Sequence, residues 1–126
     1  MKKVGLLLGM VVLLLATNAL AFTINFEWNR NTETDMGHYT MYQSTAADMS
    51  GKVSAGSIAQ PVSGTTVQWS YVFTPPAGTE VTYYYAVTAL DTTGNESGIS
   101  NIVSTRVDNK APAVPTGPLH ILGVLP

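Results

Sequence analysis

The feature that most constrains the fold is residues 81–90, where the side chains alternate strictly along the chain. One face would carry Val81, Tyr83, Tyr85, Val87 and Ala89, and the other Thr82, Tyr84, Ala86 and Thr88. Because successive side chains of a strand point to opposite faces, this pattern is typical of a β-strand with one buried face. The turn-forming residues 91–95 follow it.

The same period of two recurs from residue 22 onward. It predicts further strands at residues 22–28, 38–44 and 67–73, and a last strand is expected at roughly 99–107. Residues 44–64, rich in Ser, Gly and Ala, lack this clear alternation, and a short edge strand is expected there at 53–58. The segments between them are rich in Gly, Pro, Asn, Asp and Ser, which favour turns and loops. Outside the first segment no stretch has the period of a helix. The chain is therefore predicted to be all-β, an antiparallel β-sandwich or barrel.

Residues 1–21 have the pattern of a secretory signal peptide. Lys2 and Lys3 precede an apolar run at 4–15, and Ala19-Leu20-Ala21 is a small-x-small cleavage site. An uncleaved membrane anchor is the alternative, but the run is shorter than the roughly 18 to 20 residues that cross a bilayer. Cleavage would begin the mature chain at Phe22. The protein is thus expected to be secreted, extracellular or periplasmic, with no membrane attachment after cleavage.

Composition excludes several classes of protein. The chain has no cysteine, which rules out disulfide scaffolds, thiolate zinc sites and a thiol nucleophile. The formal net charge is −2, and loss of Lys2 and Lys3 makes it more negative. Since no basic stripe is available for phosphates, nucleic acid is not an expected partner.

Without disulfides, stability must come from apolar side chains buried between the predicted strands. The predicted core consists of Ile24, Phe26, Trp28, Tyr39, Met41, Trp69, Tyr71, Tyr83, Tyr85, Val87 and Ile102.

Three segments carry a resemblance to a known family. They are Phe26-Glu27-Trp28, residues 35–42 and, most specifically, residues 82–97. Together they resemble a fibronectin type III domain of the kind common in secreted bacterial proteins, over residues 22–107. The resemblance implies an immunoglobulin-like antiparallel sandwich with Trp28 at its centre. It also implies that the Tyr83 phenol reaches back to backbone near the preceding turn.

The resemblance departs from the family pattern at both ends. Such domains begin with a strand ahead of the tryptophan strand, whereas cleavage after Ala21 leaves only residues 22–27 before Trp28. The first strand is therefore expected to be short or missing. The proline-rich tail, residues 108–126, resembles the linker and first strand of a following domain. Two interpretations stay open: a stiff extended tail, or a strand at 119–125 that pairs beside residues 22–28 in its own or the next subunit.

Catalytic chemistry is poorly represented. The only histidines are His38 and His120, and no nucleophile elbow, zinc helix or phosphate-binding glycine loop occurs. No enzymatic activity, catalytic residue or cofactor is expected. Two polar loops offer weak calcium candidates, because oxygen ligands from adjacent loops can hold Ca²⁺. These candidates are Asp35, Asp91, Asn95 and Glu96, supported by Asn29, Asn31 and Glu33; the same residue types also form turns.

Tyr42 and Tyr84 form a candidate binding face, because they fall on the outward side of their strands if Tyr39 and Tyr83 point inward. Cross-strand packing on a solvated face is the alternative. The expected function is that of a secreted, non-enzymatic module for adhesion, surface assembly or protein interaction, with a protein partner or self-association. The alternatives are a structural subunit that polymerises by exchanging its C-terminal strand, and a carbohydrate-binding accessory module.

Overall fold

The computed structural model describes residues 20–126, so the predicted signal lies outside the described residues except for Leu20 and Ala21. Within that range the chain forms strands and loops and no helix. The strands are β1 Phe22–Asn29, β2 Met36–Ser44, β3 Val53–Ala59, β4 Thr66–Phe73, β5 Glu80–Asp91 and β6 Val103–Asp108. The first five coincide with predicted strands to within two residues at each end.

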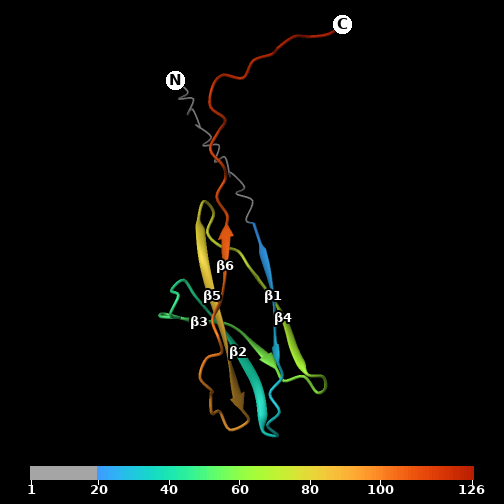
Figure 1. Ribbon diagram of the computed structural model, residues 1–126, viewed down its shortest axis with the longest axis vertical. Helices are drawn as coiled ribbons and strands as arrows, with labels where there is room; N and C mark the ends of the chain where they lie inside the picture. Colours follow the sequence, from blue (N-terminus) through green and yellow to red (C-terminus); the bar gives the residue numbers. More distant parts are fainter. Residues whose placement is uncertain (1–19) are drawn as a thin grey trace, which may run out of the picture.

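The six strands form two antiparallel sheets (Figure 1). β1 pairs with β4 in a two-stranded sheet, and the other sheet has the order β3-β2-β5-β6. Burial alternates along β1 and β4: the side chains on one face of each strand, polar except for Val72, are open to water, and those on the other face pack on the larger sheet. Two antiparallel sheets with a shared interior are consistent with a β-sandwich rather than a closed barrel.

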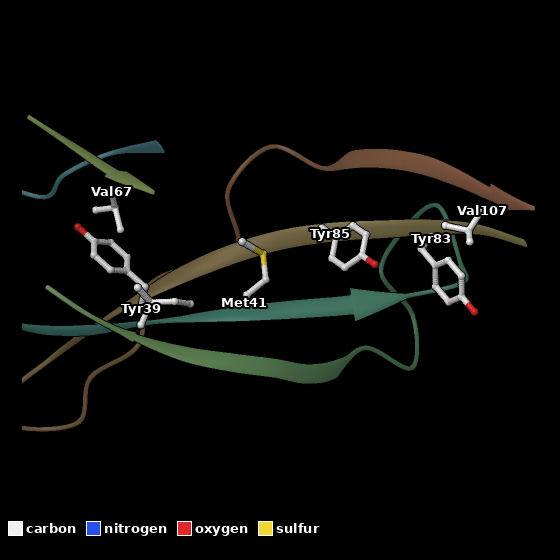
Figure 2. Close-up of a cluster of buried hydrophobic side chains, with 7 residues drawn as sticks. Tyr39, Met41, Val67, Tyr83, Tyr85 and Val107 are labelled. Atoms are coloured by element: carbon white, nitrogen blue, oxygen red, sulfur yellow. The ribbon is translucent and has the colours of Figure 1, made fainter. Parts of the chain in front are cut away.

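The buried cluster lies along the inner faces of β2 and β5 (Figure 2). It comprises Tyr39, Met41, Ile58, Val67, Tyr83, Tyr85 and Val107. Other predicted core residues are half-buried and pack against it, namely Ile24, Phe26, Trp28, Trp69, Tyr71 and Val87. Aromatic rings join the two sheets: Phe26 lies 5.0 Å from Tyr85, and Phe73 lies 5.1 Å from Tyr83 between ring centroids.

Gly56 in β3 leaves room for the indole of Trp69. A Cβ atom at this position would lie 2.6 Å from Trp69 Cζ2, closer than atoms can approach. We expect Gly56→Ala to lower the free energy of unfolding by about 1–3 kcal/mol through overpacking. Urea denaturation measures this, with Gly98→Ala as the control, because a Cβ there meets no atom within 4 Å. Equal stability of the two variants would contradict the packing.

The predicted strand at residues 99–107 is wrong in its first part, because β6 begins only at Val103. The hydroxyls of Ser97 and Ser100 accept hydrogen bonds from the N–H groups of Ala89 (2.9 Å) and Val87 (3.0 Å) on β5. From Ser97 to Ser100 the chain moves three residues, while its partners on β5 move only two, from Ala89 to Val87. This extra residue breaks the alternation of side chains between the two faces. Ile102, predicted in the core, is consequently 38% exposed.

The phenol of Tyr83 does not make the expected hydrogen bond to backbone within residues 20–126; Tyr39 makes such a bond instead. The Tyr39 oxygen accepts from the Asn31 N–H and donates to Gln60 Oε1, both at 2.7 Å. Tyr83 is buried through its ring, which meets Phe73 edge-on. Tyr83→Phe is therefore not expected to remove a buried hydrogen bond.

Candidate functional site

One edge of β1 is open. The backbone N–H of Arg30 donates to Thr65 O (2.9 Å), and the register pairs Phe22–Asn29 with residues 73–66 of β4. Because hydrogen-bonded pairs alternate in an antiparallel ladder, the backbone groups of Thr23, Asn25 and Glu27 point away from β4. Within residues 20–126 no strand pairs with that side of β1. The edge therefore offers a row of donors and acceptors to an added strand.

A groove of about 100 Å³ lies beside this edge. Its lining is mostly apolar and comes from both sheets and from the segment before β6: Phe26, Glu27, Trp28, Met41, Tyr85, Ala86, Val87, Ser100, Asn101 and Val103. Val103 is 46% exposed, and the neighbouring Ile99 and Ile102 are also exposed. The irregular segment described above thus leaves apolar side chains uncovered at the gap between the sheets.

Trp28 contributes an unsatisfied polar atom to this region. Its indole Nε1 is buried and has no hydrogen-bond partner among residues 20–126. The ring packs edge-on against Tyr39 at 5.3 Å, which accounts for its apolar surface but not for the N–H group. A buried donor without an acceptor costs about 1–3 kcal/mol.

The predicted calcium residues do come together. Asp35, Asp91, Asn95 and Glu96 line a hollow of about 290 Å³ with Asn31 and Glu33. Hydrogen bonds from the Asn95 side chain and backbone and from Thr93 hold the pKa of Asp91 well below its usual range. Within residues 20–126 no three acidic or histidine side chains are placed to share a metal ion. These hydrogen bonds show that the Asp91 carboxylate stabilises the turn at residues 91–95.

Tyr42 and Tyr84 lie on the outer face of the larger sheet, where Tyr42 is opposite Ala86 and Tyr84 is opposite Ser44. The Tyr42 phenol donates to Glu96 Oε1 (2.7 Å), which also accepts from Thr88 Oγ1 (2.7 Å). Lys52 Nζ lies 5.3 Å from the centroid of the Tyr42 ring. One ring of the predicted binding face is therefore already engaged by neighbouring side chains.

Tyr85 provides a pH-dependent prediction. Burial raises the pKa of Tyr85 to about 12, while the hydrogen bond from Gln43 Nε2 (2.7 Å) lowers it. Because the folded pKa exceeds the ordinary value of 10.0, its contribution to stability is complete below pH 10.0 and is lost as the pH rises through about 12. We expect an absorbance titration to show a phenolate step near 12 that Tyr85→Phe removes. In urea the same step should move to about 10; an unchanged titration of the variant would contradict the assignment.

Comparisons of the chain with protein-family models, curated protein sequences and solved structures find no match. Within residues 20–126 there is no helix of the length and apolar character that crossing a membrane requires.

Proposed function

We propose that the protein is a secreted, non-enzymatic interaction module with an immunoglobulin-like sandwich of the fibronectin type III kind. It binds protein partners by adding their extended segments to the open edge of β1. The observation that carries this proposal is the combination of unpaired backbone groups on β1 with an apolar groove beside them. Main-chain hydrogen bonds then supply affinity, and side chains that enter the groove supply specificity.

The strand order supports the fold part of the proposal. In immunoglobulin-like sandwiches the second and fifth strands share one sheet, and the third, sixth and seventh share the other. If β1 is counted as the second strand of such a sandwich, β4 is the fifth, and these two do share a sheet. On the same count β2, β5 and β6 are the third, sixth and seventh strands, and they share the other sheet. β3, the fourth strand on this count, pairs with β2 in the larger sheet instead. Among residues 20–126 the place of a first strand, beside β1, is unfilled. This agrees with the short or missing first strand that the resemblance implied.

The positions of the two histidines support binding rather than catalysis, and the predicted signal supports export. His38 lies near the start of β2, at the end of the molecule opposite to the tail that carries His120, so the two imidazoles cannot share a site. The predicted signal at residues 1–21 would direct the chain out of the cytoplasm, into the periplasm or medium.

A photo-crosslinking amino acid at Asn25, whose backbone faces the open edge, tests the proposal in the producing cells. We expect irradiation of the exported protein to give covalent adducts. The same residue at Thr40, on the outer face of β2, which is paired on both sides, is the matched control and should give far fewer. Mass spectrometry of the mature chain should also find Phe22 at its N-terminus. Absence of adducts at Asn25 would overturn the proposed binding edge.

A further inference from the structure

We propose that the strand bound by β1 is residues 119–125 of a second copy of this chain, running antiparallel to β1. This inference rests on the proposed function, since it names the partner of the same edge. It makes the protein a subunit that assembles by donating its own C-terminal segment.

The donor segment is apolar and uncovered. Leu119, Ile121, Leu122, Val124 and Leu125 are each at least 83% exposed, although they lie within seven residues of one another. The tail that carries them leads away from the strands after β6 (Figure 1). A contiguous apolar segment of this kind marks a contact surface, because exposure of so many large side chains is unfavourable in water.

The length and pattern of this segment fit the open edge. Residues 119–125 as a strand would span about 23 Å, and β1 spans about 26 Å at roughly 3.3 Å per residue. In extended form Leu119, Ile121 and Leu125 share one face, while Leu122 and Val124 share the other. One face can therefore enter the apolar groove beside the open edge of β1.

Chain direction favours a second copy over the same subunit. Leu20 and residues 108–111 line one hollow, so β1 begins where β6 ends and the tail leaves. A strand antiparallel to β1 must start at the other end, near Asn29. In its own subunit the tail would first have to run back along the whole of β1 and then reverse. A second copy placed end to end receives the tail already pointing in the required direction.

The segment before the donor strand supports this arrangement. Pro112, Pro115 and Pro118 recur every third residue, the spacing of an extended polyproline helix. The chain bends at Thr116 and Gly117, where Gly117 has a φ of 85°, so the extended spacer covers residues 109–115 and would span about 22 Å. Since each copy has one donor segment and one acceptor edge on different surfaces, the contact does not close on itself. The expected assembly is an open chain of copies.

Light scattering after size-exclusion chromatography of the exported protein tests this inference. We expect the wild type to form a concentration-dependent series at multiples of the chain mass. Ile121→Asp with Leu122→Asp places a carboxylate on each face of the donor strand and should give the single-chain mass. Val114→Asp with Thr116→Asp adds the same charge in the proline-rich segment before the donor strand and should assemble like the wild type. A single-chain wild type, or an assembled Ile121/Leu122 variant, overturns the inference.

A mixing experiment separates donation between copies from pairing within one copy. Asn25→Pro removes an outward N–H from β1 and leaves a copy that can only donate, because proline is tolerated on an edge strand. The Ile121/Leu122 variant can only accept. We expect each alone to be single-chain and their mixture to stop at dimers; a mixture without dimers overturns the inference.

The crosslinker at Asn25 distinguishes this inference from the proposed function. Adducts at multiples of the chain mass support self-donation. Adducts of a different mass, with a single-chain wild type, overturn the inference and leave the proposed function standing. No adducts overturn both.

Discussion

Tyr39→Ala should lower the free energy of unfolding by about 3–5 kcal/mol, the range for removing a large buried aromatic side chain. Tyr39 is only 1% exposed and lies at one end of the buried cluster, beside Val67 (Figure 2). Its phenol also holds Asn31 and Gln60, while Gln60 Nε2 donates to Asn31 O (2.8 Å). The substitution therefore creates a cavity and removes two of these three hydrogen bonds, leaving only the direct bond from Gln60 to Asn31 between the loop before β2 and the segment after β3. Urea denaturation followed by tryptophan fluorescence measures the change.

Tyr39→Phe is the matched control for this prediction. It keeps the ring and removes only the hydroxyl, so we expect a loss of about 1–3 kcal/mol from the partners left unsatisfied. A loss as large as that of Tyr39→Ala would show that the hydrogen bonds outweigh packing. No loss in either variant would place Tyr39 outside the core.

Trp28→Ala should lower the free energy of unfolding by about 3 kcal/mol, at the lower end of the range for tryptophan because the ring is half-buried. The indole packs edge-on against Tyr39, and it lines the groove beside the open edge. Its removal would join that groove to a new cavity. Thermal and urea denaturation measure the loss. The exposed Val72→Ala on the outer face of β4 is a control expected to change stability little.

Trp28→Phe distinguishes the ring from its N–H group. Since Nε1 has no partner among residues 20–126, phenylalanine forfeits no hydrogen bond there, and we expect a loss below about 1.5 kcal/mol. Because Trp28 and Tyr39 are in contact, their alanine variants should be non-additive by about 0.5–3 kcal/mol in a double-mutant cycle. Strict additivity would contradict the contact.

The strands could be predicted from the sequence because alternation is a local property. In β1, β2, β4 and β5 alternate residues form an apolar face, and no helical period competes with it; β3 shows this pattern least, because Ser54 and Gly56 precede the buried Ile58 at the alternate positions. The prediction failed at residues 99–102 because hydroxyls of Ser97 and Ser100 replace carbonyls as partners of β5. Whether a hydroxyl takes the place of a backbone carbonyl in the sheet depends on which residues lie opposite on the neighbouring strand. The local alternation of side chains contains no information about that neighbour.

The candidate site, like the strands, could be predicted only in part from the sequence. The outward-facing Tyr42 and Tyr84 and the polar loops were found from the sequence, yet Tyr42, Asp91 and Glu96 are bound to neighbours that become visible only in three dimensions. The bond of the Tyr39 phenol to Gln60, and the burial of Val67 and Val107, were missed for the same reason. Their partners lie far away along the chain.

By itself the sequence determined an all-β chain, the residues that face inward on most strands, and an apolar segment after a spaced run of prolines. Only the tertiary structure decided that β1 and β4 stand apart from the larger sheet, that the free side of β1 borders an apolar groove, and that Trp28 Nε1 lacks a partner. The physical reason is that a period of two specifies which face of a strand is buried. It does not specify which strand becomes its neighbour, because that choice depends on contacts between distant segments.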